Sequence, residues 1–327
     1  MIERIGQIIL CGFDTPEPSD EFLEFVNTEN VGGVILFEEN ANPHIMAESS
    51  IKSIISAGSV IPFIAVDQEG GRVCRFRGAP AEFDSPAEYG RLANLELFSE
   101  QFGRAAYYLH SLGVNLFFGP VADLQINPEN RCLEGRTFGS NPARVIPFIE
   151  KAIKIASRAG ILSCLKHFPG FGAAANDPHQ EIAVADYDEQ TFLNRESLTF
   201  KAGIGAGADM VMTTHLLTPG IDEHPAPVSE RIVQKLLRER LGFDGIVITD
   251  DLLMLGAGEI GEVGERALKA FLAGHDILLF GRDFRAARAA LHYIKAAYKK
   301  GLIDDDRLEA SLDRISGIKS KLAAPVI

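Results

Sequence analysis

ILSCLKH, residues 161–167, is an apolar run that ends in two ionisable side chains, Lys166 and His167. A short run without regular alternation between apolar and polar positions is typical of a strand that is covered on both faces. Strands of this kind belong to parallel sheets. The ionisable residues also mark the end of the strand at which polar groups gather, so the same segment bears on fold and function.

Seven further runs of the same kind recur along the chain, which makes eight in all. They are IGQIILCGF from Ile5, VGGVILF from Val31, IPFIAVD from Ile61, VNLFFGPVAD from Val114, DMVMTTH from Asp209, GIVITDD from Gly245 and HDILLFG from His275. Amphipathic stretches of helical period separate the runs, for example residues 21–30, 91–113, 192–207, 229–242 and 285–301.

Eight buried strands that alternate with helices predict an α/β protein with a parallel (β/α)₈ barrel, the TIM barrel. No Pro/Ser-rich linker divides the chain, so we expect one domain over residues 1–327. Residues 302–322 are expected to form a closing helix on the outside. A doubly wound sheet is the alternative, but CGFDTPEPSD after the first run lacks the Gly-rich fingerprint of such sheets.

Composition excludes several function classes. The chain has 32 Lys and Arg against 45 Asp and Glu, a net charge of −13, which argues against a nucleic-acid partner. The chain contains no charge-free apolar stretch of about 20 residues, so we expect no membrane span. We also expect no signal peptide. Four cysteines stand far apart without a C-x-x-C pair, namely Cys11, Cys74, Cys132 and Cys164. We therefore expect a cytoplasmic protein with reduced thiols. We expect neither a metal nor another cofactor. We also expect a monomer.

Ionisable residues gather where the predicted strands end. The third strand ends in Asp67 to Arg72, the fourth in Asp123, the fifth in Lys166 and His167, the sixth in His215 and the seventh in Asp250 and Asp251. Each alone fits a helix cap or a structural histidine. Their recurrence at one end favours a functional site, because the carboxyl ends of barrel strands form the active-site mouth.

Two long connections add candidate residues. Residues 124–142 carry Arg136 and run too far for a simple turn. Residues 168–181, rich in Gly, Ala and Pro, place Asp177 two positions before His179. A carboxylate beside an imidazole fixes its tautomer and stabilises the imidazolium, which suits proton transfer. An Asx turn before Pro178 with an exposed histidine explains the spacing equally well.

Six segments together resemble the family 3 glycoside hydrolases, specifically the short bacterial β-N-acetylglucosaminidases. They are DQEGGRV (67–73), GVNLFFGPVAD (113–123), GRTFGSNP (135–142), KHFPG (166–170), MTTH (212–215) and LGFDGIVITDDL (241–252). The resemblance spans nearly the whole chain in the same order. It implies a (β/α)₈ barrel and a small carbohydrate substrate, with retaining hydrolysis of terminal β-linked N-acetylglucosamine through a glycosyl-enzyme intermediate.

The resemblance also implies roles for individual residues. Asp250 is the expected nucleophile, a choice over Asp251 that the residues alone do not make. His179 is the expected general acid/base and Asp177 its orienting partner, because the chain has no room for a second domain that would supply an acid. The expected sugar-binding residues are Asp67, Arg136, Lys166 and His167, with Asp123 and His215 as further candidates.

One segment departs from the family pattern. The family commonly continues KHFPG with His-Gly-Asp, whereas this chain reads Phe171-Gly172-Ala173. The missing polar groups put the positioning of the loop and the acceptor preference in question. Phe171 either stacks on a sugar or aglycone face or packs the loop down.

The residues also fit other functions. Lys166 at a strand end would suit a Schiff-base aldolase or lyase if the pKa of its ammonium were lowered. A metal-dependent hydrolase would use His167, His179, His215 and Asp67, although no H-x-H or H-E-x-x-H spacing supports it. A β-glucosidase and a sugar-binding barrel without catalysis are further alternatives.

Overall fold

Eight parallel strands form a nearly closed barrel in the computed structural model, which describes residues 1–174, 182–258 and 260–322. The strand order is β11-β9-β7-β6-β3-β2-β1-β12. An isolated bridge between Ile248 and Ile277 brings the last strand beside β11. The prediction of a (β/α)₈ barrel is confirmed.

Each barrel strand coincides with one of the eight predicted runs, and only β7 extends beyond its run, by the single residue Phe168. The strands are β1 (Ile9–Cys11), β2 (Gly33–Leu36), β3 (Phe63–Val66), β6 (Leu116–Phe117), β7 (Leu162–Phe168), β9 (Met210–Thr213), β11 (Ile246–Thr249) and β12 (Leu278–Phe280). Every residue of these strands is buried, which agrees with apolar runs that lack alternation. Two short pairs stand apart from the barrel: antiparallel β4 (Gln68–Gly70) and β5 (Val73–Cys74), and parallel β8 (Ala183–Val184) and β10 (Leu216–Leu217).

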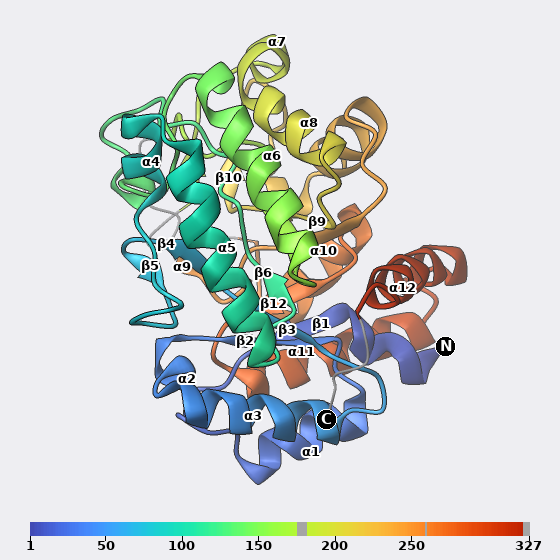
Figure 1. The fold of residues 1–327 in the computed structure, drawn as a ribbon. Helices are drawn as coiled ribbons and strands as arrows, with labels where there is room; N and C mark the ends of the chain where they lie inside the picture. The colour runs from blue at the N-terminus through green and yellow to red at the C-terminus, as the bar shows by residue number, and fades with distance from the viewer. Residues whose placement is uncertain (175–181, 259, 323–327) are drawn as a thin grey trace.

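Helices surround the barrel (Figure 1). The α-helices are α1 (Asp20–Glu29), α2 (Glu38–Ala41), α3 (His44–Ala57), α4 (Pro86–Leu92), α5 (Leu95–Ser111), α6 (Pro142–Arg158), α7 (Glu189–Thr191), α8 (Ser197–Gly205), α9 (Leu255–Gly258), α10 (Val263–Ala273), α11 (Phe284–Lys299) and α12 (Asp305–Lys319). The 3₁₀ helices are η1 (Ile2–Ile8), η2 (Arg131–Leu133) and η4 (Ala226–Val228), and the π-helices are η3 (Phe192–Glu196) and η5 (Arg231–Arg240). Capping side chains begin several helices; Asn94 Oδ1, for example, accepts from the Leu97 N–H.

The first predicted strand is shorter than its apolar run. Ile5 to Ile8 belong to the 3₁₀ helix η1, and only Ile9–Cys11 pair as β1. The helix approaches its neighbours closely, because a Cβ on Gly6 would lie 1.7 Å from the Glu29 carbonyl oxygen. A short buried apolar run fits a helix as well as a strand, so periodicity alone did not separate the two.

The expected closing helix is present as α12. It packs against η1 and against β11, beside the N-terminus of the chain (Figure 1). Among residues 1–174, 182–258 and 260–322, no helix combines the length and the apolar character needed to cross a bilayer.

Candidate active site

A cavity of about 550 Å³ lies at the carboxyl ends of the barrel strands. Five of the expected site residues line it, namely Asp67, Arg136, Lys166, His167 and Asp250. They come from segments that are far apart in sequence and are brought together because parallel strands end at one face of the barrel. The predicted gathering of ionisable groups is therefore found in space.

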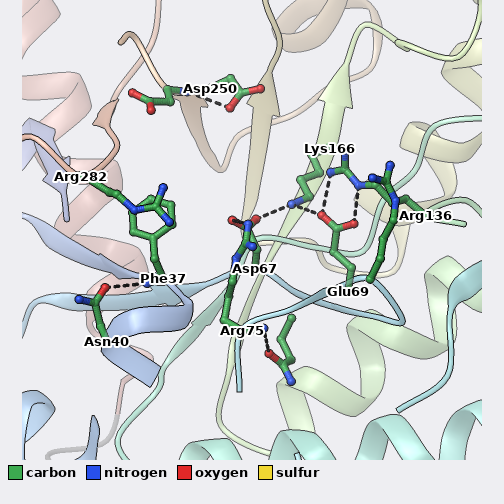
Figure 2. A network of polar contacts seen from close by, with 12 residues as sticks. Phe37, Asn40, Asp67, Glu69, Arg75, Arg136, Lys166, Asp250 and Arg282 are labelled. Atoms are coloured by element: carbon green, nitrogen blue, oxygen red, sulfur yellow. Dashed lines mark hydrogen bonds and ion pairs between the residues drawn. The ribbon is translucent and has the colours of Figure 1, made fainter. Parts of the chain in front are cut away.

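Four charged side chains form an ion-pair network on one wall. The Lys166 Nζ lies 2.6 Å from Asp67 Oδ1 and 2.5 Å from Glu69 Oε1. Arg136 binds Glu69 with both arms of its guanidinium, through Nε at 2.7 Å and Nη2 at 2.8 Å. Figure 2 shows Lys166 between the two carboxylates and Arg136 beyond Glu69. The four formal charges balance, which lets this network stay buried.

The pKa values of these groups are set by opposing effects. Burial raises the pKa of Glu69, but Arg136 and Lys166 outweigh it and hold that pKa far below its ordinary value. Burial lowers the pKa of Lys166, and the carboxylates of Asp67 and Glu69 outweigh it, so its pKa lies above the ordinary value. A Schiff-base lysine needs a lowered pKa, so this geometry argues against the aldolase alternative.

His167 is oriented by a buried carboxylate behind the cavity. Its Nε2 lies 3.3 Å from Arg136 Nη2, which can only donate, so Nε2 accepts. The Nδ1–H therefore donates to Asp123 Oδ2 at 2.6 Å, and the backbone N–H of His167 donates to the same oxygen at 3.0 Å. Asp123 does not line the cavity; it positions a residue that does.

The two adjacent acids after β11 have different surroundings. Asp250 Oδ1 accepts from the Asp251 N–H at 2.8 Å, and its Oδ2 lies 3.4 Å from Thr214 Oγ1. Asp251 Oδ1 accepts from the backbone N–H groups of Leu253 and Gly281, at 2.9 and 2.8 Å. Burial raises the pKa of Asp251. Asp251 thus holds together the turns after β11 and β12, a distinction that the sequence did not provide.

His215 lies beneath this turn. It is fully buried, is not part of the cavity lining, and donates through Nε2 to the Asp251 carbonyl oxygen at 2.8 Å. Burial lowers the pKa of its imidazole. Its contact is with the backbone beside Asp250. The expected catalytic pair, Asp177 and His179, lies outside the described residues.

Sequence reasoning missed several residues that line the cavity. Glu69 stands two positions after Asp67, so both point to the same side of an extended segment, a period-two signal that was available in DQEGGRV. Arg75 Nη2 lies 3.4 Å from Asp67 Oδ2. On another wall Arg282 stacks on Phe37 at 3.9 Å from the ring centroid, as Figure 2 shows. No local motif predicted that stack.

Phe171 packs at the start of the loop that departs from the family pattern. Its side chain is 2% exposed, lines the cavity, and meets the His167 ring edge-on at 6.3 Å between centroids. Its N–H donates to Asp123 Oδ1 at 2.7 Å, and its carbonyl accepts from Asn130 Nδ2 at 3.0 Å. Of the two expectations for Phe171, these contacts fit packing of the loop base. Over the described part of the chain, no cluster of three or more His, Cys, Asp or Glu is arranged to hold a metal ion.

A family model described as the glycosyl hydrolase family 3 N terminal domain matches residues 1–318. The chain belongs to glycosyl hydrolase family 3. Its class is therefore that of a glycosidase. A beta-hexosaminidase of Actinobacillus pleuropneumoniae serotype 3 is 34% identical to this family 3 chain over 278 residues, which cover 83% of this chain and 80% of the relative.

Solved structures agree with the family. A family 3 beta-N-acetylglucosaminidase from Paenibacillus sp. str. FPU-7 is 29% identical with a TM-score of 0.96; the match covers 100% of this chain but only 64% of that one. A beta-N-acetylhexosaminidase from Beutenbergia cavernae DSM 12333 is 27% identical with a TM-score of 0.90, over 97% and 98% of the two chains. The family 3 chain thus matches a structure of its own length and part of a longer one.

Proposed function

We propose that this chain is a retaining β-N-acetylglucosaminidase, which releases terminal β-linked N-acetylglucosamine through a covalent glycosyl-enzyme intermediate. The observation that carries the proposal is the cavity at the mouth of a family 3 barrel, where Asp250 lies in the same space as Asp67, Lys166, Arg136 and His167. Relatives named as hexosaminidases and N-acetylglucosaminidases support the choice of sugar.

The proposed chemistry has two steps. In the first, the Asp250 carboxylate attacks the anomeric carbon, and the departing glycosidic oxygen takes a proton from His179, so the aglycone leaves as an alcohol. In the second, His179 removes a proton from water, whose oxygen attacks the same carbon and frees Asp250. Two inversions give net retention. Asp177 would orient His179 in both steps.

The ion-pair network would bind the sugar hydroxyls. Lys166 and Arg136 would donate charge-assisted hydrogen bonds to oxygens of the sugar hydroxyls, and Asp67 would accept a hydrogen bond from a sugar hydroxyl. Because each is already held by a partner, little side-chain freedom is lost when the sugar arrives. A hydrogen bond from a sugar hydroxyl to the Asp67 carboxylate would strengthen as positive charge develops on the ring in the oxocarbenium-like transition state, because that charge makes the hydroxyl a better donor.

Cellular context is a further part of the proposal. We propose a cytoplasmic monomer that acts on muropeptides from cell-wall recycling, with chitin fragments and glycoconjugates as the other sources of terminal N-acetylglucosamine. The described thiols Cys11, Cys74 and Cys164 are free and buried, which fits a reducing compartment.

The test is turnover of aryl β-N-acetylglucosaminide beside aryl β-glucoside by the wild type, Asp250→Ala and His179→Ala. We expect preference for the N-acetyl sugar and a loss of at least about a thousandfold in kcat for Asp250→Ala. His179→Ala should lose most with poor leaving groups, because they need protonation. Asp244→Ala, an exposed acid before the same strand, is the matched control.

Each alternative has its own outcome. Faster turnover of the glucoside would indicate a β-glucosidase, and sugar binding without turnover of either substrate would indicate a non-catalytic barrel. Undiminished activity of Asp250→Ala would overturn the mechanism. The anomeric configuration of the first product, read by NMR, tests retention directly.

A further inference from the structure

A second cavity, of about 600 Å³, adjoins the active-site cavity. We call it the side groove; it runs between α4 and the connection that leads to α6. Arg131 belongs to the lining of both spaces, so the two are neighbours through this one side chain. A substituent that extends beyond the first cavity past Arg131 would enter the side groove.

Hydrogen bonds from Arg72 hold the backbone around Arg131 in place. The guanidinium of Arg72 donates to three carbonyl oxygens, those of Arg131 at 3.0 Å, Cys132 at 2.6 Å and Glu134 at 2.8 Å. These bonds fix the short helix η2 against the β4–β5 hairpin. The exposed side chain of Arg131 therefore projects from a braced turn.

The side groove carries unbalanced positive charge. It is lined by Arg91, Arg131 and Arg144 against a single acid, Glu134. Arg91 is paired with Glu88 at 2.6 Å. Among the described residues neither Arg131 nor Arg144 has a carboxylate partner, and Arg144 Nη2 donates only to the Gly90 carbonyl oxygen, at 2.9 Å. In a chain of net charge −13, this concentration of unpaired guanidinium groups favours an anionic occupant.

The aromatic content of the groove argues against a neutral sugar chain as its occupant. Phe138 lines the groove, but its side chain is only 4% exposed. Its ring is stacked on Phe148 at 4.7 Å between centroids and meets Phe98 edge-on at 5.4 Å. No open aromatic face is left on Phe138 for a sugar to stack on. Guanidinium groups that match a carboxylate in two hydrogen bonds remain the recognisable feature.

We propose that the side groove binds a carboxylate-bearing extension of the aglycone, held by Arg131 and Arg144. The inference rests on the proposed function, since it assigns a place to the leaving portion of that substrate. It adds a second binding site beside the catalytic one. The site favours acidic aglycones longer than a single sugar over neutral ones of equal length.

A matched pair of substrates tests this site. Chitotriose oxidised at its reducing end gives an aldonic acid, and borohydride reduction gives the neutral alditol of the same length. We expect the wild type to cleave the acid with a kcat/KM about tenfold above that of the alditol, through a lower KM, because the contact is made equally before and during reaction. Raising the salt concentration from about 0.05 M to about 1 M should bring the ratio towards one.

Variants locate the effect. Arg144→Gln and Arg131→Gln should each reduce the acid-to-alditol ratio severalfold, whereas Arg158→Gln, an exposed arginine at the end of α6, should leave the ratio unchanged. A wild-type ratio near one at low salt would overturn the proposal, as would a ratio that survives in both groove variants.

Aryl β-N-acetylglucosaminide has no extension and serves as the reference substrate throughout. Turnover of this substrate without any preference for the acid would contradict the proposed binding role of the side groove but not the proposed function. If the wild type did not turn over aryl β-N-acetylglucosaminide at all, the proposed function itself would be contradicted.

Discussion

Glu69 binds two cations of the cavity, Arg136 and Lys166, through one carboxylate, so we expect its loss to affect both stability and activity. Its side chain is 1% exposed and contacts both Arg136 and Lys166. Glu69→Gln keeps the shape but turns an amide N–H₂ towards a cation. We expect the free energy of unfolding to fall by about 3–5 kcal/mol, the range found when one partner of a buried pair is removed.

Activity should fall with stability, because Lys166 and Arg136 would no longer be held in place. We expect kcat/KM on aryl β-N-acetylglucosaminide to drop about a hundredfold in Glu69→Gln. Glu88→Gln is the matched control: Glu88 binds Arg91 with the same two-armed geometry, but at the surface, where little change in stability is expected. Equal effects of the two substitutions on denaturant unfolding would contradict this account.

The candidate site could be predicted where polar residues end a strand, and not where they act through another residue. Asp67 and Asp250 directly follow β3 and β11, Lys166 and His167 lie near the end of β7, and the structure places all four in one cavity. Asp123 is held by the backbone N–H of Phe171, 48 positions later in the sequence, and no local pattern predicts this contact. Nothing in the sequence distinguished Asp250 from Asp251; their hydrogen-bond partners do.

At the scale of elements, prediction succeeded where burial is complete on both faces and failed where it is ambiguous. All eight barrel strands coincide with the apolar runs, with β7 one residue longer than its run. The run from Ile5 begins as the helix η1, in which Gly6 packs closely against the backbone of Glu29. The amphipathic stretch 229–242 is helical, as expected, but η5 is wound as a π-helix. Apolar periodicity shows which face is buried and is less sensitive to the exact winding.

His275 joins helix α10 to the barrel and gives the fold an acid-sensitive contact. Its Nδ1 lies 2.9 Å from the Ala270 carbonyl oxygen, to which Nδ1–H donates, so Nε2 accepts from Thr213 Oγ1, also at 2.9 Å. Burial lowers the pKa of this imidazole to about 4 from 6.5. A lowered histidine pKa means that its contribution is complete above pH 6.5 and is lost as the pH falls towards 4, by up to about 3 kcal/mol.

His275→Asn should therefore flatten the pH dependence of stability. Its amide can still donate to Ala270, but it does not titrate. We expect the stability difference between wild type and variant, measured by urea unfolding, to shrink steadily from pH 6.5 to pH 4. Parallel profiles over that interval would show that His275 is not the titrating contact.

At the scale of the whole molecule, the closing helix buries a lysine against the barrel. Lys319 of α12 is 8% exposed; its Nζ donates to Gln7 Oε1 at 2.8 Å and lies 4.9 Å from the centroid of the Phe63 ring. Among the described residues no carboxylate pairs with it, and burial lowers the pKa of its ammonium to about 7 from 10.5. The helix thus docks best when this lysine is neutral.

The sign of the effect follows from that pKa. Between pH 10.5 and pH 7 the unfolded chain binds a proton at Lys319 that the folded chain resists, so the folded state loses stability as the pH falls, by up to about 4 kcal/mol at pH 7. Lys319→Met removes the charge while filling similar space, and should raise the free energy of unfolding at pH 7 by a few kcal/mol. The gain should shrink as the pH approaches 10, whereas Lys300→Met, at an exposed position, should show no such trend. A variant less stable than wild type at pH 7 would mean that the contacts with Gln7 and Phe63 outweigh desolvation, and that the ammonium helps to hold the helix on the barrel.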